Sequence, residues 1–240
     1  MNRTILPRIV LTALILFATF LTPASAQTTS DPVEELLARM TPEQKIGQLF
    51  ITTFDGSDGG PDSAIGKLIT EHYVGGVVLL AVSENFTNDE NAPAQVANLS
   101  NQLQERALSN GLDLPVFIAI DHEGDGFPYS RMTGGLTDIP NPMAIGATWD
   151  PDNARAIGEI TGQELSASGI NLLLGPDADV LNNPRPLGRG DIGTRTFGGD
   201  PWWVGQMAQA YIYGLHEGSA GSVASVAKHF PGHGGSDRLP

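Results

Sequence analysis

The feature that most constrains the fold is a regular alternation of short apolar runs with longer stretches of helical periodicity. The runs are continuous, whereas a strand with one face in water alternates apolar and polar residues. Five of them follow one another: "IGQLFIT" from Ile46, "GGVVLLAV" from Gly75, "PVFIAID" from Pro115, "INLLLGP" from Ile170 and "SVASVAKHF" from Ser222. Continuous runs of this length predict buried strands in a parallel sheet that is covered on both faces.

The segments between the runs carry helix start and stop signals. Residues 150–169 begin with Asp-Pro and end in glycine, and residues 199–218 repeat this design, because proline fits the first turn of a helix and glycine fits its end. Residues 60–73 have apolar residues at helical spacing, and residues 91–111 end in glycine. Strands that alternate with helices predict right-handed β-α-β units, in either a doubly wound sheet or a (β/α)-barrel.

Polar clusters after the runs favour the barrel. The segments "IDHEGDG", "GPDADVLNNPRP" and "KHFPGHGG" lie at the carboxyl ends of three runs, and polar residues that converge from several strand ends are typical of a barrel. A doubly wound sheet would have a glycine-rich loop after its first strand, and no G-x-G-x-x-G or Walker-type motif occurs there. We therefore predict an α/β fold of the (β/α)8 TIM type. Because such a barrel has eight strands, about five βα units represent only an incomplete amino-terminal part.

The first 26 residues predict a secretory signal peptide. Arg3 and Arg8 give it a positive start, residues 9–21 are apolar, and "ASA" ending at Ala26 is a small-residue cleavage site. The apolar stretch is short for a membrane span, so no stable membrane anchor is expected, although a retained signal anchor is the alternative. Residues 27–240 are then expected to form one domain that is secreted or lies in the cell envelope.

The charge balance and the absence of cysteine exclude several classes of function. The sequence holds 13 Lys and Arg against 27 Asp and Glu, a net charge of −14, and loss of the first 26 residues would remove two more arginines. Such an acidic surface repels phosphate backbones and anionic lipids, so nucleic acid is not an expected partner. Without cysteine there is no disulfide, no thiolate nucleophile and no cysteine-ligated metal.

Polar residues at the predicted strand ends suggest a sugar site. Asp121 directly follows a strand, and a carboxylate can accept hydrogen bonds from two sugar hydroxyls. Arg195 has a fixed fork of donors that would orient a polar ligand, although a surface ion pair with Asp191 or Asp200 would also explain it. Lys228 and His229 leave the fifth run together, and a rigid turn with a buried histidine is the simpler interpretation of that pair.

The segment "KHFPGHG" from Lys228 to Gly234 resembles the signature of the amino-terminal (β/α)-barrel of glycoside hydrolase family 3, especially its β-N-acetylglucosaminidase branch. Other blocks occur in the family's order and at its spacing: "MTPEQKIGQLF" from Met40, "GGVVLL" from Gly75, "IAIDHEG" from Ile118, "GINLLLGPDADV" from Gly169 and "IGTRTFGGDP" from Ile192. The resemblance covers about Met40 to Pro240. It implies a carbohydrate substrate, with terminal β-N-acetylglucosamine of an amino-sugar glycan favoured over a β-glucoside or β-xyloside, and no cofactor.

The resemblance also implies roles for individual residues. Asp121, Arg195, Lys228 and His229 match the family's sugar-binding positions. Arg131 is the candidate for an arginine that the family has closer to the "EG" of residues 123–124. Hydrolysis in the family retains the anomeric configuration through a covalent glycosyl-enzyme.

The proton-transfer group and the nucleophile depart from the family's pattern. In the glucosaminidase branch an Asp-Ser-His triplet follows the glycine-rich loop and passes protons. The corresponding "GGSDRLP" holds only Asp237, which is the candidate acid/base and would need a pKa raised by burial. The family's nucleophilic aspartate lies on a later strand, beyond residue 240, so this chain alone is expected to be inactive.

Two other functions stay open. A zinc-dependent barrel hydrolase would use nitrogen and oxygen ligands at strand ends and would lose activity with a chelator; its possible ligands are His122, Glu123, His229, His233 and Asp237. A non-catalytic module that binds cell-wall sugars would bind an amino sugar without turnover, and the short segment after His233 agrees with it. The glycosidase interpretation, which we favour, expects no metal site.

Overall fold

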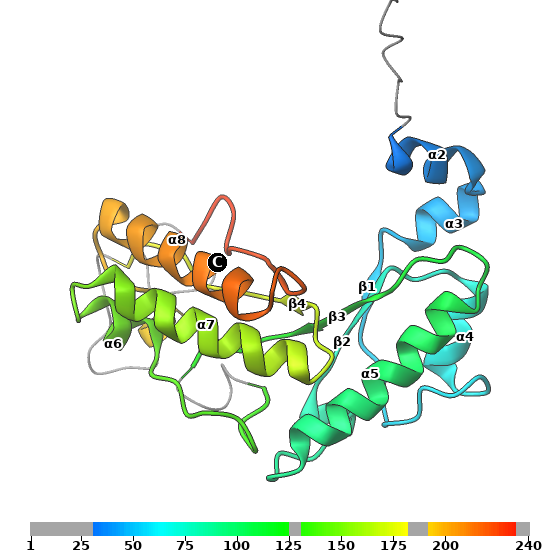
Figure 1. Ribbon diagram of the computed structural model, residues 1–240, viewed down its shortest axis with the longest axis horizontal. Helices are drawn as coiled ribbons and strands as arrows, with labels where there is room; N and C mark the ends of the chain where they lie inside the picture. Colours follow the sequence, from blue (N-terminus) through cyan, green and yellow to red (C-terminus); the bar gives the residue numbers. More distant parts are fainter. Residues whose placement is uncertain (1–30, 125–130, 182–191, 234–240) are drawn as a thin grey trace, which may run out of the picture. The chain divides into compact units, whose positions relative to one another are not determined.

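The computed structural model describes residues 31–124, 131–181 and 192–233 (Figure 1). The predicted signal peptide of residues 1–26 and the candidate acid/base Asp237 lie outside these ranges. Across the described ranges, no helix combines the length and the apolar character that a membrane span requires. The chain divides into two compact units, Met1–Arg39 and Met40–Pro240.

The described part of the first unit is helix α2 (Pro32–Arg39). Asp31 Oδ1 accepts a hydrogen bond of 2.9 Å from the backbone N–H of Val33, which satisfies one of the free donors of the first turn. Glu34 and Glu35 lie in that first turn and Arg39 lies in the last. This order of charges favours the helix, because it opposes the helix dipole at both ends.

The second unit is built on a five-stranded parallel sheet. Its strands lie in the order of the sequence, β1-β2-β3-β4-β5, and each pairs with the next. The strands are β1 (Ile51–Thr52), β2 (Gly76–Val78), β3 (Phe117–Ile120), β4 (Leu172–Leu173) and β5 (Ala224–Ser225). A doubly wound sheet reverses its strand order near the middle, whereas a barrel wall keeps the order of the chain. The prediction of an incomplete TIM-type barrel is confirmed.

Helices connect the successive strands, and the four predicted from the sequence are present. They are α4 (Ala64–Glu71), α5 (Ala92–Leu108), α7 (Pro151–Ala167) and α8 (Pro201–Gly218). The predicted start signals act as expected: Asp150 Oδ1 accepts from Asp152 N at 3.1 Å, and Asp200 Oδ1 accepts from Trp203 N at 2.8 Å. Figure 1 shows α4 beside α5 and α7 beside α8, with each pair packed next to the strands that it connects.

Besides α2, two short helices, α3 (Pro42–Gly47) and α6 (Pro142–Gly146), were not predicted. The first apolar run was therefore assigned wrongly at its start, since Ile46 and Gly47 end helix α3 and strand β1 begins only at Ile51. A capping box starts α3: Gln44 N donates to Thr41 Oγ1 at 3.2 Å, and Thr41 N donates to Gln44 Oε1 at 2.9 Å. The capping box is visible in the sequence as Thr-x-x-Gln ahead of the first apolar run. The helix start that it sets takes precedence over the strand that the apolar run predicts.

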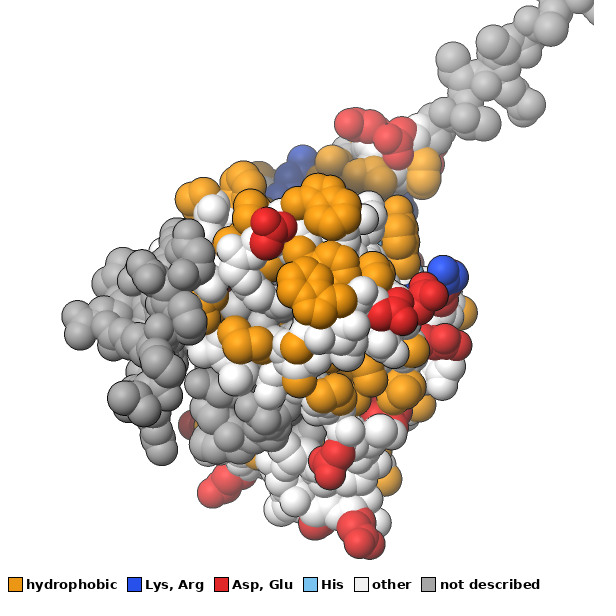
Figure 2. All heavy atoms as spheres, turned by 90° about the vertical axis from the view of Figure 1, so that its left-hand side faces the viewer, with side chains coloured by type: hydrophobic (Ala, Val, Ile, Leu, Met, Phe, Trp, Pro, Cys, Tyr) orange, Lys and Arg blue, Asp and Glu red, His pale blue; other side chains and the backbone are white. Residues whose placement is uncertain are grey.

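The core of the second unit lies between the sheet and the helices. Strands contribute Val77, Ile118, Ile120 and Leu173, and helices contribute Ile65, Ile69, Leu99, Leu103, Leu165, Met207 and Leu215, all buried in one cluster. Acidic side chains are spread over the face shown in Figure 2, between apolar ones, and basic side chains are few there. The net negative charge of the sequence thus shows on this surface.

Helices α7 and α8 approach closely because glycines line their contact. A Cβ atom on Gly158 would lie 2.1 Å from the carbonyl oxygen of Tyr211, and one on Gly214 would lie 1.9 Å from that of Arg155. Such separations are far below van der Waals contact, so only glycine allows the two backbones to meet at these points.

Candidate functional site

The candidate site lies at the carboxyl ends of strands β3, β4 and β5. Asp121 and Glu123 follow β3, Asp177 and Asp179 follow β4, and Lys228 and His229 follow β5. Isolated parallel bridges pair Asp177 with Lys228 and with Thr196, which bring the segment of Arg195 to the same edge. Because the strands are parallel and adjacent, residues from distant parts of the sequence meet at one edge of the sheet.

The carboxylates of Asp121 and Glu123 and three cations form an ion cluster at this edge, with Asp177 at its border. Lys228 Nζ lies 2.9 Å from Asp121 Oδ1 and also pairs with Glu123 Oε1. Arg195 holds Glu123 in a bidentate pair, with Nε 2.5 Å from Oε2 and Nη2 3.1 Å from Oε1. Arg131 Nε lies 3.7 Å from Asp121 Oδ2. The cluster fixes the side chains of Asp121 and Lys228 in an arrangement that presents both an acceptor and a donor.

Glu123 is the residue at the centre of this cluster, and sequence reasoning considered it only as a possible zinc ligand. Its side chain is 2% exposed, while that of Asp121 is 23% exposed. A buried carboxylate requires ionic partners, and Lys228 and Arg195 supply two of them. Glu123 therefore holds the side chains of Lys228 and Arg195 in place, whereas part of the Asp121 carboxylate stays accessible to a ligand. In the sequence, only the position of Glu123 two residues after Asp121 indicated that it could belong to the site.

Arg195 lies in the 3-10 helix η2 (Gly193–Arg195) and points into the site. The sequence left a surface ion pair with Asp191 or Asp200 as an alternative explanation for it. Arg195 pairs with Glu123, its Nε lies 3.9 Å from Asp177 Oδ2, and only 14% of its side chain is exposed; Asp191 lies outside the described residues. Asp200 has a different role, because its carboxylate caps helix α8.

Burial changes the protonation of two further groups near the site. Loss of solvent raises the pKa of Asp177 to about 6, although the backbone N–H of Asp179 and the charge of Arg195 act in the opposite direction. Burial lowers the pKa of His122 to about 4, against the attraction of Glu164. His122 is therefore a neutral interior residue near pH 7, and its Nδ1 has no hydrogen-bond partner among the described residues.

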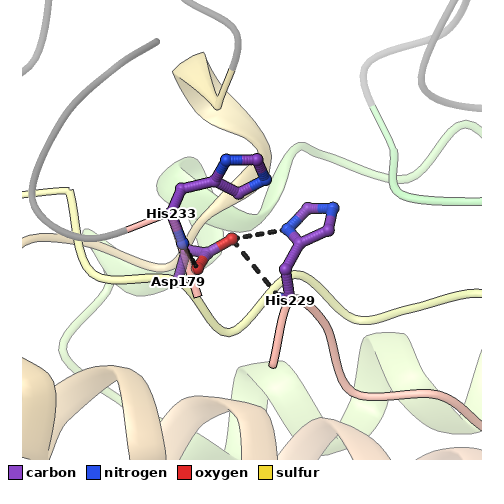
Figure 3. Close-up of side chains that lie close together, drawn as sticks. All are labelled: Asp179, His229 and His233. Carbon is purple, nitrogen blue, oxygen red and sulfur yellow. Dashed lines mark hydrogen bonds and ion pairs between the residues drawn. The ribbon is translucent and has the colours of Figure 1, made fainter. Parts of the chain in front are cut away.

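Asp179 organises the second polar group of the site, which contains His229 and His233 (Figure 3). Its Oδ2 lies 2.6 Å from His229 Nδ1, and its Oδ1 accepts a hydrogen bond of 2.8 Å from the backbone N–H of His233. Burial acts to raise the pKa of Asp179, but the hydrogen bonds from His229 and His233 together with their charge lower it. Asp179 belongs to the "GPDADV" segment, one of the motifs that carry the family resemblance, yet its pairing with His229 was not predicted.

Of the predicted sugar-binding residues, the structure brings Asp121, Arg131, Arg195 and Lys228 into one cluster and places His229 beside it on Asp179. Of the possible zinc ligands that the structure describes, only His229 and His233 come together, since Glu123 pairs with cations and His122 is buried separately. Asp237 lies outside the described residues.

A parallel α/β barrel wall with charged and hydrogen-bonding side chains at its strand ends is the architecture of a barrel enzyme that binds a polar substrate. The model of the glycosyl hydrolase family 3 N-terminal domain matches residues 41–239. The chain belongs to this family, as the motif resemblance indicated.

Known proteins similar to this chain have two kinds of activity in their names. Beta-hexosaminidase A of Pseudoalteromonas piscicida is 35% identical over 174 residues, which are 71% of this chain and 27% of that protein. Beta-glucosidase C of Emericella nidulans is 31% identical over 84% of this chain and 32% of that protein. A solved family 3 beta-N-acetylglucosaminidase from Paenibacillus sp. superposes with a TM-score of 0.69 and 38% identity, covering 81% of this chain and 34% of that one. The chain thus spans about a third of the length of these relatives.

Proposed function

We propose that this chain supplies the sugar-binding half of a β-glycosidase that removes terminal β-N-acetylglucosamine. The observation that carries the proposal is the Asp121 carboxylate, which Lys228 and Arg131 hold at the end of β3 while part of it stays exposed. A fixed carboxylate next to fixed cationic donors matches the alternating donors and acceptors of a sugar ring. The hexosaminidase and acetylglucosaminidase relatives support the amino sugar, and the β-glucosidase relative makes glucose the second candidate.

The chemical step is proposed to be a retaining displacement. Such a reaction needs two carboxyl groups about 5–5.5 Å apart, one as nucleophile and one as proton donor. Asp237 is the proposed proton donor, and the resemblance matches no residue of this chain with the nucleophile. The described residues therefore carry recognition: they hold the hydroxyl groups, and bond cleavage depends on groups outside them.

Export is part of the same proposal. The positive start, the apolar stretch and the small residues ending at Ala26 support a cleaved signal peptide. Expression in a bacterial host, followed by mass measurement of the exported chain, tests it: a mature start near Gln27 is expected, and retention of Met1 on a cell-associated protein would contradict it.

Sugar binding and turnover are tested separately. The chain without residues 1–26 is titrated with N-acetylglucosamine, glucose and xylose in a calorimeter, and N-acetylglucosamine is expected to bind most tightly. Release of nitrophenol from nitrophenyl β-N-acetylglucosaminide and β-glucoside is then measured, with and without a chelator, in this chain and in any longer reading frame that contains it.

The outcomes separate the three functions. Turnover by the longer protein that a chelator does not affect supports the glycosidase. Sugar binding with no turnover in either protein would leave a sugar-binding module, and activity that a chelator abolishes would indicate the zinc-dependent hydrolase. The absence of binding to any of the three sugars would overturn the proposed recognition site.

A further inference from the structure

The group formed by Asp179, His229 and His233 has the composition of a metal site. One donor atom of each side chain lies within 4.8 Å of the others. In Figure 3 the rings of His229 and His233 lie next to each other beside the Asp179 carboxylate, and the ring centroids are 4.2 Å apart. Asp179 follows β4, while the two histidines follow β5, so the sheet register itself brings the three donors together.

His233 supplies the observation that points to a ligand. Its Nε2 atom is buried and has no hydrogen-bond partner among the described residues. A buried polar atom without a partner destabilises the fold. The hydrogen bond between Asp179 and His229 is sufficient to orient His229. That role does not explain why a nitrogen of the second imidazole, His233, is buried beside the pair.

We infer that Asp179, His229 and His233 form a binding site for one divalent cation of the zinc class. Two imidazole nitrogens and one carboxylate oxygen suit Zn²⁺, Co²⁺ or Ni²⁺, whereas Mg²⁺ and Ca²⁺ prefer sites made of oxygen donors. Three protein ligands would leave the fourth tetrahedral position to a water molecule. Asp179 brings a carboxylate charge that favours a cation.

The three donor atoms lie within 4.8 Å of one another, so cation binding requires shifts of up to about 1.5 Å. Tetrahedral zinc with bonds of 2.0–2.2 Å separates its donors by about 3.3 Å. Asp179 Oδ2 and His229 Nδ1 are 2.6 Å apart, so a cation bound between them would move them apart by less than about 1 Å. The side chain of His229 is 34% exposed, which gives the cation a path from solvent.

Occupancy of this site would weaken sugar binding, and this consequence rests on the proposed function. His229 belongs both to the cation site and to the proposed sugar site, so the cation would hold its imidazole away from the position that Asp179 sets. The cation would also place positive charge next to Lys228. Zinc would then be an inhibitor of this protein, which is the opposite of its role in a zinc-dependent hydrolase.

The direct test is a calorimetric titration of the untagged chain with ZnCl₂, repeated with MgCl₂. Wild-type protein is expected to bind one Zn²⁺ per chain and no Mg²⁺. His233→Ala should weaken zinc binding by roughly 100-fold or more, since loss of even a supporting partner of a metal ligand costs 10–100-fold. His216→Ala is the matched control, because His216 is exposed on helix α8 and lies outside the cluster. Titration with Co²⁺ gives a visible absorption spectrum that reports nitrogen ligation directly.

Two further measurements keep the test decisive. If His233→Ala does not fold, as judged by circular dichroism, His233→Gln, which keeps a larger polar side chain at this position, replaces it. N-acetylglucosamine binding is then measured with and without ZnCl₂, and zinc is expected to weaken it in wild-type protein but not in the His233 variant. No saturable zinc binding, or equal zinc affinity in the His233 and His216 variants, would overturn the cation site. Zinc binding without any sugar binding would instead overturn the proposed function alone.

Discussion

Lys228 Nζ lies 2.9 Å from Asp121 Oδ1, although the two residues are 107 positions apart in the sequence. Asp121 follows β3 and Lys228 follows β5, with β4 between them. Neighbouring strands lie about 4.8 Å apart, so β3 and β5 are separated by about 9.5 Å. A lysine side chain that reaches toward an aspartate can span this distance, but a short polar side chain cannot. This pair therefore ties the ends of three strands together and positions the only partly exposed carboxylate of the described ion cluster.

Replacement of Asp121 by Asn tests the recognition site. The amide keeps the shape of the side chain but loses the charge that Lys228 holds and that sugar hydroxyls would bond to. Hydrogen bonds to charged groups contribute about 1.5–3 kcal/mol, so binding of N-acetylglucosamine should weaken roughly 10- to 100-fold. Isothermal titration of Asp121→Asn and of Asp138→Asn, an exposed control, measures the effect. Equal affinities in the two variants would show that Asp121 does not touch the sugar.

Glu123→Gln is expected to destabilise the fold. The side chain is buried between Lys228 and Arg195, so a neutral amide would leave two cations without their common partner. Removal of one member of a buried ion pair costs about 3–5 kcal/mol, and the free energy of unfolding in urea should fall by about 3 kcal/mol. Glu217→Gln is the control, because Glu217 pairs with Arg155 at the surface and such pairs contribute about 0–1 kcal/mol. Similar small losses in both variants would contradict the central role of Glu123.

His122 should make the fold sensitive to acid. Its pKa is lowered from 6.5 to about 4 in the folded protein, so the unfolded chain takes up the proton first as the pH falls. The contribution of neutral His122 is fully present above about pH 6.5 and declines by about 3 kcal/mol as the pH approaches 4.

Urea unfolding of His122→Gln, compared with the exposed His216→Gln, checks this dependence. From about pH 7 to pH 4 the wild-type protein and the His216 variant should lose more stability than His122→Gln. Parallel stability curves for the three proteins would show that His122 does not remain neutral in the fold.

Substitutions by Ala at two glycines of helix α8 should change stability in opposite directions. A Cβ on Gly214 would lie 1.9 Å from the carbonyl oxygen of Arg155, so Gly214→Ala should destabilise by about 1–3 kcal/mol through overpacking of α7 against α8. Gly205 has no atom within 4 Å of such a Cβ. Gly205→Ala should therefore stabilise the protein by about 0.5–1 kcal/mol, because alanine favours the helix more than glycine does. Thermal unfolding of the two variants distinguishes them, and a shift of the same sign in both would argue against the glycine-lined contact.

The sequence by itself determined the fold class, the order of the elements and the position of the site along the chain. Continuous apolar runs between capped helices require a parallel sheet, and the polar residues at the run ends then have to meet at one edge. Asp121 and Lys228 became candidates in this way, whereas Arg195 became one through its glycine-flanked segment and the motif resemblance. Helix α3 was missed, although its Thr-x-x-Gln capping box is visible, because the apolar run that follows dominates the pattern.

Only the tertiary structure decided which charge pairs with which. Glu123 lies two positions from Asp121, yet it is buried between Lys228 and Arg195 while Asp121 stays partly exposed. Asp179 meets His229 across 50 positions. These pairings depend on the register of neighbouring strands and on the paths of the loops that return to them. Local sequence fixes the dihedral preferences of each segment, but the distance between segments is set by packing of the whole sheet.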